Sequence, residues 1–208
     1  MNKDLWEEED QKNIQMYSSL LDKHGTSHKT LNWGSRESQN LRFKVLSGIG
    51  IKSGSSVLDV GCGIGDLFAW FRDQTLDVNY TGIDIASDLI GEAKKRFPEG
   101  RFATHNLLKN SLREKFDYVF ASGIFAVRAS GGDEYLHTML KQLYLYCTKG
   151  MAFNILSTWS QYPLDAEDYA ADPAKLWKFC SSLTPWTVIR HDYHPNDCSF
   201  YLYTERNR

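Results

Sequence analysis

The most constraining feature of the sequence is a short apolar run that leads directly into three glycines, VLDVGCGIGD at residues 57–66. The run at 56–60 is short and β-prone, which predicts a buried strand. Gly61, Gly63 and Gly65 let the backbone turn sharply and approach a ligand closely. Residues 67–74, LFAWFRDQ, are typical of a helix. The segment therefore predicts a strand, a glycine turn and a helix.

The same alternation continues along the chain. Further strands are predicted at 80–85, 101–107, 116–123 and 150–157, with helices at 87–97 and 133–147. Strands that are apolar on both faces and alternate with helices indicate a parallel sheet covered on both sides. The last two strands, 187–193 and 198–205, are separated only by HPND, which requires an antiparallel hairpin. We expect an α/β fold with a doubly wound, mostly parallel seven-stranded sheet and an antiparallel C-terminal hairpin.

The first 50 residues differ from this core. Residues 5–23 predict an amphipathic helix ending near Gly25, the segment at 25–38 reads as a loop, and 39–51 resumes a helical pattern. A chain of 208 residues is in the range of one sizeable core. We expect a single domain over residues 1–208, made of an N-terminal helical extension (1–50) and an α/β core (51–208).

Composition excludes several classes of partner. Apolar residues make up 42% and charged residues 24%, as in folded globular proteins. The net charge of −2 provides no overall positive field to hold nucleic acid. The longest apolar stretches, such as 118–127, are about half of what a membrane helix needs, and the acidic start lacks a signal-peptide pattern. We expect a cytoplasmic protein with neither nucleic acid nor membrane as partner.

The four cysteines, Cys62, Cys147, Cys180 and Cys198, form no Cys-x-x-Cys pair and have no metal-type spacing with the histidines. Free thiols in a reducing compartment are the expectation. The sequence predicts no metal site.

The residues around the glycine turn point to a nucleoside. Asp84 follows the next predicted strand, about 20 residues after the turn, where an acidic side chain of an open α/β sheet holds a ribose hydroxyl pair. The dinucleotide fingerprint requires a third glycine at position 66, and this sequence has Asp66. NAD therefore fits poorly. Asp59, just before the turn, would disfavour a pyrophosphate and suit a cationic amine or sulfonium.

The motifs VLDVGCGIGDL and YTGIDI resemble the first and second motifs of the class I S-adenosylmethionine-dependent methyltransferase superfamily, and the likeness extends over roughly residues 56–157. The resemblance implies S-adenosylmethionine as cofactor and S-adenosylhomocysteine as product. It also implies that the glycine turn contacts the amino acid part of the cofactor, that Asp84 holds the ribose and that Ile85 stacks beside the adenine.

Later positions also match the superfamily pattern. Asn106 stands where the third strand usually ends in an acid that accepts from the adenine amino group, and an amide oxygen can accept the same bond. Ser122 and Gly123 match the cofactor-lining end of the fourth strand. Arg42 lies where some members bind the cofactor carboxylate, although a helix-surface arginine explains it equally. The predicted cofactor contacts are Arg42, Asp59, Gly61, Cys62, Gly63, Gly65, Asp84, Ile85, Asn106, Leu107, Ser122 and Gly123.

Methyl transfer from a sulfonium is an in-line displacement, so a protein mainly aligns the acceptor and excludes water. No catalytic side chain is assigned. His105, His191 and His194 are candidates for a general base, but a histidine bonded elsewhere or facing solvent is the simpler interpretation of each.

The predicted acceptor contacts are Tyr17, Trp33, Ser122 and Arg128. Tyr17 and Trp33 belong to the extension, which in related enzymes often closes over the site, and ordinary packing is the alternative for both. The segment at 157–173 carries Trp159, Tyr162 and Tyr169 in a position where acceptor specificity commonly resides, or is a surface loop.

The wider pattern is similar to bacterial methyltransferases without an established acceptor. We expect O- or N-methylation of a small molecule by a monomer or homodimer. Methylation of RNA, DNA or protein is a second hypothesis, although ASGIF lacks the Asn/Asp-Pro-Pro-aromatic tetrad of amino-methylating nucleic acid enzymes. A cofactor-binding module without catalysis is a third.

Overall fold

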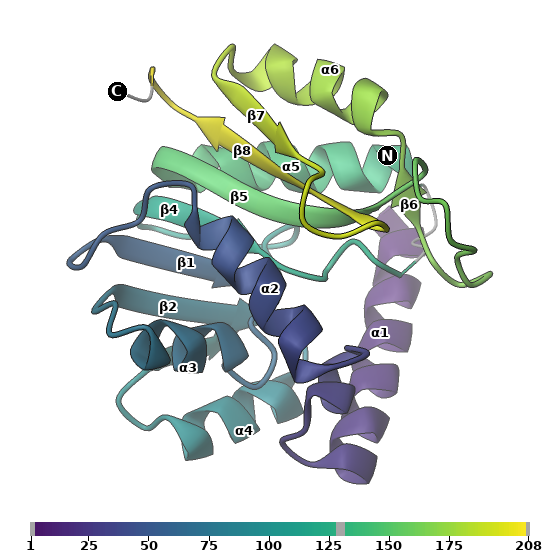
Figure 1. Ribbon diagram of the computed structural model, residues 1–208. Helices are drawn as coiled ribbons and strands as arrows, with labels where there is room; N and C mark the ends of the chain where they lie inside the picture. The colour runs from purple at the N-terminus through teal and green to yellow at the C-terminus, as the bar shows by residue number, and fades with distance from the viewer. Residues whose placement is uncertain (1–2, 128–131, 207–208) are drawn as a thin grey trace.

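The computed structural model describes residues 3–127 and 132–206, and its centre is one sheet in the order β3-β2-β1-β4-β5-β8-β7 (Figure 1). The pairs from β3 to β5 are parallel, whereas β8 runs antiparallel to both β5 and β7. This confirms the predicted fold class. The strands are β1 (Ser56–Val60), β2 (Asn79–Asp84), β3 (Arg101–Thr104), β4 (Phe116–Ala121), β5 (Cys147–Ser157), β7 (Thr187–Arg190) and β8 (Asp197–Tyr203).

Helices cover both faces of this sheet. One face of the sheet is covered by α2 (Arg36–Ser47), α3 (Asp66–Asp73) and α4 (Ser87–Arg96), which contribute Phe43, Leu67 and Ile90 to the core there. The other face packs against α5 (Asp133–Tyr146) and α6 (Pro173–Leu183). Two further elements, α1 (Lys3–His24) and the 3-10 turn η1 (His28–Leu31), lie at the carboxyl ends of the strands (Figure 1). A ligand at these strand ends therefore meets α1 and η1.

Strand alternation distributes the side chains of β1 between the two faces. Leu58 and Val60 belong to the core beside α5, whereas Val57 belongs to the core beside α2 and α3. Asp59 shares the face of Val57 and meets Tyr80 of β2 there. Successive residues of a strand point to opposite faces, so this placement of Asp59 follows from the position of the apolar residues around it.

Several elements differ from the predicted boundaries for local reasons. The helix predicted from residue 39 begins at Arg36, because Ser35 caps it by accepting from Ser38 N–H at 3.0 Å. The predicted loop also contains η1, capped in the same way by Ser27. Strand β7 ends at Arg190, three residues before the predicted end.

Two elements have no counterpart in the sequence analysis. The first is α6, although Asp172 caps it and Pro173 occupies its first turn, a recognisable helix start. The second is the short strand β6 (Ala170–Ala171), which pairs with the end of β5. Within the described residues, no helix is long and apolar enough to cross a membrane.

Candidate functional site

Two positions of the glycine turn after β1 have no room for a side chain. Gly61 and Gly63 have φ of +74° and +53°, in the left-handed region. A Cβ added to Gly61 would lie 2.1 Å from Ile124 Cγ2, and one added to Gly63 would lie 2.6 Å from a methyl carbon of Leu31. Glycine is therefore required both for the backbone conformation and for the close approach of these neighbours.

Asp66, which replaces the third glycine of a dinucleotide fingerprint, anchors the turn. Its buried carboxylate accepts from Arg36 at 2.8 Å, from Arg96 at 2.9 Å and from Gln39 at 3.0 Å. Arg96 also donates to the carbonyl oxygen of Ile64 at 2.6 Å. Since Asp66 opens α3, its charge also complements the helix dipole. These contacts fix α2, α3 and α4 around the glycine turn.

Asp84 at the end of β2 is bonded to the same turn. One carboxylate oxygen accepts from the Gly63 N–H at 2.9 Å and the other from the Ala86 N–H at 2.9 Å. Burial raises the pKa of Asp84 and outweighs the opposing effect of these donors. Each carboxylate oxygen can accept more than one hydrogen bond, so Asp84 can still receive hydroxyl groups of a ligand.

A cleft runs along the carboxyl ends of the parallel strands, and its empty space, including the part open to solvent, is about 990 Å³. It brings together most of the residues predicted from sequence, which come from four different strand ends and from the N-terminal extension. These are Tyr17, Trp33, Gly61, Gly63, Asp84, Ile85, Asn106, Leu107, Ser122 and Gly123.

Four predicted cofactor contacts are not among the described residues that line this cleft. Asp59 points to the opposite side of β1, where it accepts a hydrogen bond from the Tyr80 hydroxyl at 2.5 Å, and burial raises its pKa to about 7. Cys62 is buried beneath the turn, and Gly65 packs under Phe102. Asp59 therefore does not line the cleft, where a contact with a cationic ligand was predicted. Arg128 lies outside the described residues.

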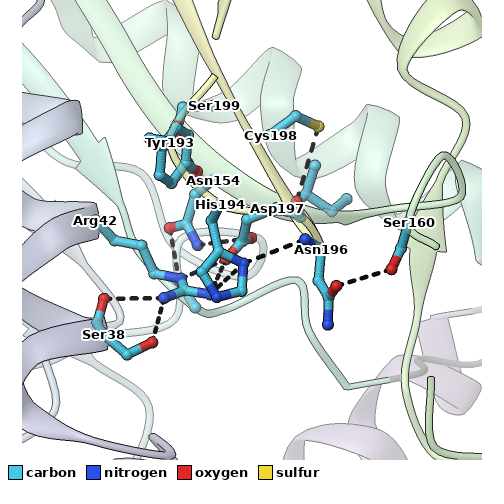
Figure 2. A network of polar contacts seen from close by, with 12 residues as sticks. Ser38, Arg42, Asn154, Ser160, Tyr193, His194, Asn196, Asp197, Cys198 and Ser199 are labelled. Atoms are coloured by element: carbon cyan, nitrogen blue, oxygen red, sulfur yellow. Dashed lines mark hydrogen bonds and ion pairs between the residues drawn. The ribbon is translucent and has the colours of Figure 1, made fainter. Parts of the chain in front are cut away.

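Arg42 is the fourth predicted cofactor contact outside the cleft, and its side chain contacts other residues of the protein. Its guanidinium forms a buried ion pair with Asp197 of β8 and donates to the carbonyl oxygen of Ser38 at 2.9 Å, as Figure 2 shows. The prediction that Arg42 binds a cofactor carboxylate is not supported, because Arg42 does not line the cleft and its guanidinium is paired with a carboxylate of the protein itself. Sequence reasoning could not see this partner, which lies at the other end of the chain.

This buried pair nevertheless supports one wall of the cleft. Asn154 Nδ2 donates to Asp197 at 3.5 Å, and Asn154 Oδ1 accepts from the Gly123 N–H at 3.2 Å. Trp33 packs on the other side, with its ring centre 5.1 Å from the Arg42 guanidinium carbon. Arg42 and Asn154 of this network contact Trp33 and Gly123 at the wall of the cleft, while Arg42 itself does not line it.

Sequence analysis missed most of the inward face of α1. Asp10, Asn13, Ile14 and Tyr17 line the cleft together. Their spacing of three, four and seven residues places them on one side of a helix, and this was the available signal. Other lining residues that were missed are Leu31, Leu89, Ile124, Val127, Tyr135 and Met139.

One fully buried side-chain oxygen of the cleft has no partner within the described part of the chain. The Oγ of Ser122, at the end of β4, is buried and makes no hydrogen bond. A buried hydroxyl without a partner costs free energy, which a polar ligand in the cleft would remove. Ser122, the glycine turn and Asp84 thus fit a ligand with a polar chain and a ribose.

The three histidines considered as general bases are all engaged. His105 lines the cleft, but its Nε2 lies 2.9 Å from the carbonyl oxygen of Asn110. His191 Nε2 lies 2.8 Å from Ser157 Oγ, and His194 Nδ1 lies 3.5 Å from Arg42. Each contact occupies one ring nitrogen, and His191 and His194 do not line the cleft.

Comparison with known proteins agrees with this geometry. A family model described as a methyltransferase domain matches residues 58–150. Rv1506c of Mycobacterium tuberculosis, whose name places it among methyltransferases, is 32% identical over 144 residues, which are 66% of this chain and 86% of that protein. Malonyl-acyl-carrier-protein O-methyltransferase of Acetivibrio thermocellus is 38% identical over 76 residues, covering 36% of this chain and 27% of that enzyme.

Solved structures share the fold at low sequence identity. Magnesium protoporphyrin IX methyltransferase from Synechocystis PCC 6803, crystallised with S-adenosylhomocysteine, has a TM-score of 0.68 at 15% identity, covering 93% of this chain and 95% of that one. The complex of DhpI with S-adenosylhomocysteine has a TM-score of 0.67 at 14% identity, covering 92% and 95%. Sheet order, glycine turn and sequence relatives converge: the chain belongs to the class I S-adenosylmethionine-dependent methyltransferases.

Proposed function

We propose that the cleft holds S-adenosylmethionine with its amino acid part at the glycine turn and its ribose at Asp84, and that the chain transfers the methyl group to an oxygen or nitrogen of a small molecule. The observation that carries this proposal is the cleft itself. It joins Gly61, Gly63 and Asp84 to the unpartnered hydroxyl of Ser122 in one continuous space.

The remainder of the cleft supports an acceptor with an apolar body. Trp33, Ile124, Val127 and Met139 line it together with Tyr17. Helix α1 lies over this region, with Ile14, Tyr17 and Leu21 packed against the core residues Ile64, Ala86 and Leu89. A space covered by a helix in this way suits a small molecule better than a polymer, and the net charge of −2 gives nucleic acid no attraction.

Two relatives carry acceptors in their names, namely malonyl-acyl-carrier-protein and magnesium protoporphyrin IX. Both names describe those proteins alone, and they support transfer to a small chemical group. We extend the proposal to the organisation of the chain: residues 51–208 form the cofactor-binding core, and α1, η1 and Trp33 of the N-terminal extension cover its cleft within a single domain.

The chemistry required of the side chains is modest. When bound, S-adenosylmethionine supplies a methyl group on a positively charged sulfur, which is already a good leaving group. Ser122 and Gly123 orient the acceptor from the end of β4, while α1 excludes water. Burial and the nearby Asp84 raise the pKa of Tyr17 to about 12, so its hydroxyl stays protonated at neutral pH and donates to the acceptor.

Calorimetric titration with S-adenosylhomocysteine tests the proposal. Asp84→Ala should weaken binding by about 1.5–3 kcal/mol through loss of charge-assisted hydrogen bonds. Asp73→Ala, which removes an exposed carboxylate near the end of α3, is the matched control and should bind like the wild type. Equal affinity of both variants would overturn the placement of the ribose.

The two competing hypotheses, a polymer acceptor and a module without catalysis, predict different results. Salt-sensitive retention on immobilised nucleic acid would favour a polymer as acceptor. Tight cofactor binding without transfer to any pool of small molecules, nucleic acids or proteins would favour a module without catalysis.

A further inference from the structure

The order of the strands fixes where the base of a bound nucleoside lies, given the proposed placement of the cofactor. The glycine turn, Asp84 and Asn106 follow β1, β2 and β3, which are neighbours in the sheet. A nucleoside with its ribose at Asp84 and its amino acid chain at the turn must extend its base toward the end of β3. The base then meets Asn106, Leu107 and whatever covers them.

Asn106 turns its oxygen away from this position. Its Oδ1 accepts from the Leu108 N–H at 3.0 Å, and its Nδ2 donates to Asp10 Oδ2 at 2.7 Å. A backbone N–H can only donate, so this contact settles which end of the amide is the oxygen. The acceptor that sequence reasoning assigned to Asn106 is therefore engaged with its own loop.

Asp10 brings a carboxylate to the same place from α1. It lines the cleft beside Asn13, and the contact with Asn106 uses only Oδ2. Lys109 Nζ lies 3.8 Å from that same oxygen. No hydrogen bond or ion pair to Oδ1 occurs within the described part of the chain, so this oxygen remains available as an acceptor.

Apolar side chains lie on both sides of Asp10 along this face of α1, which also carries Asn13. Trp6 packs edge-on against Tyr135, with ring centres 5.8 Å apart, and Ile14 packs beside Leu89. A carboxylate on the inward side of such a face loses hydration, and burial raises the pKa of Asp10 against the opposing effects of Asn106 and Lys109. A polar ligand group beside Asp10 would compensate that cost.

We propose that Asp10 accepts the hydrogen bond from the exocyclic amino group of the adenine, so that the base is recognised from α1 rather than from the end of β3. Asn106 then acts as a positioning residue that holds the carboxylate. An ionised carboxylate only accepts, so it favours the amino group of adenine and opposes the carbonyl oxygen that hypoxanthine carries at the same position.

Asp10→Asn tests this role with little change of shape. Its amide oxygen can still accept from Asn106, which leaves the amino group facing the base as a donor. Titrations would compare S-adenosylhomocysteine with its deaminated analogue, S-inosylhomocysteine, on wild type, Asp10→Asn and Glu8→Gln. Glu8 is an exposed carboxylate on the same helix and serves as the control.

We expect the wild type and Glu8→Gln to prefer the adenosyl ligand, and the preference to fall at least about tenfold in Asp10→Asn, by loss of a charge-assisted bond and gain of a donor. An unchanged preference in a folded Asp10→Asn that binds S-adenosylhomocysteine would overturn the inference and leave the proposed function intact. A folded wild type that binds neither ligand would overturn both. Thermal unfolding without ligand confirms that the variants are folded.

Discussion

Arg42 on α2 and Asp197 at the start of β8 form a buried ion pair although they stand 155 positions apart in the sequence. The pair connects a helix of the N-terminal extension to the antiparallel part of the sheet. Asn154, which donates to Asp197 (Figure 2), also accepts from the backbone N–H of Gly123 at the cleft. The ion pair therefore stabilises one wall of the cleft. Its effect on the free energy of unfolding can be measured separately from ligand binding.

Replacing Arg42 with Met should lower the free energy of unfolding by about 3–5 kcal/mol, because it leaves the Asp197 charge buried without a partner. The double variant Arg42→Met, Asp197→Asn should recover part of the loss. Urea denaturation followed by circular dichroism measures both. The affinity of the folded single variant for S-adenosylhomocysteine should change little, and a large loss of affinity at full folding would restore a direct cofactor contact for Arg42.

Gly61→Ala should damage both the fold and the cleft. A residue with a side chain at φ +74° is strained by about 1–3 kcal/mol, and its Cβ would displace Ile124. We expect lower stability to urea and no calorimetric response to S-adenosylhomocysteine in the fraction that remains folded.

Gly91→Ala is the matched control for that change. Gly91 lies within α4, and an added Cβ there meets no atom within 4 Å. This variant should gain about 0.5–1 kcal/mol in the free energy of unfolding from helix propensity and keep its ligand affinity. Equal behaviour of the two alanine variants would contradict the role assigned to the turn.

Asp59 makes stability depend on pH in a direction opposite to that of a carboxylate stabilised by an ion pair. Its pKa rises from 3.8 to about 7 on folding, because burial favours the neutral form. The folded state then holds more protons than the unfolded state between these values, so this group lowers the free energy of unfolding as pH rises from about 4 to about 7.

Asp59→Asn removes this titration and keeps an oxygen that accepts from the Tyr80 hydroxyl. The variant should be more stable than the wild type at pH 8 and similar to it near pH 4. Urea titrations at a series of pH values measure the difference, and parallel profiles for the two proteins would show that Asp59 does not carry it.

Local patterns were sufficient for most of the fold. The apolar strand at 56–60, the glycines after it and Asp84 each depend on neighbours in the sequence, and their structures agree with the predictions. The hairpin of β7 and β8 was predictable because a short connection permits one geometry. The start of α6 was also predictable, because Asp172 and Pro173 form a recognisable helix start.

The errors concern residues whose position depends on distant partners. Asp59 stands beside the glycine turn in sequence, yet strand alternation directs it toward Tyr80 and away from the cleft. Arg42 forms an ion pair with Asp197. Asp10 accepts a hydrogen bond from Asn106 only because α1 packs across the strand ends. Neither pairing leaves a signal in a local window, since each joins residues nearly a hundred or more positions apart.

Helix α1 has a consequence for the timing of the reaction. It runs past the carboxyl ends of the strands (Figure 1) and contacts the core from Trp6, which meets Tyr135, to Leu21, which packs near Leu89. Given the proposed placement of the cofactor, we expect a spent nucleoside beneath α1 to leave faster when these contacts are weakened, which a measurement of product release on a Trp6→Ala variant would check. On this expectation the packing of α1 would influence how often the site turns over, while the strand ends would hold the nucleoside.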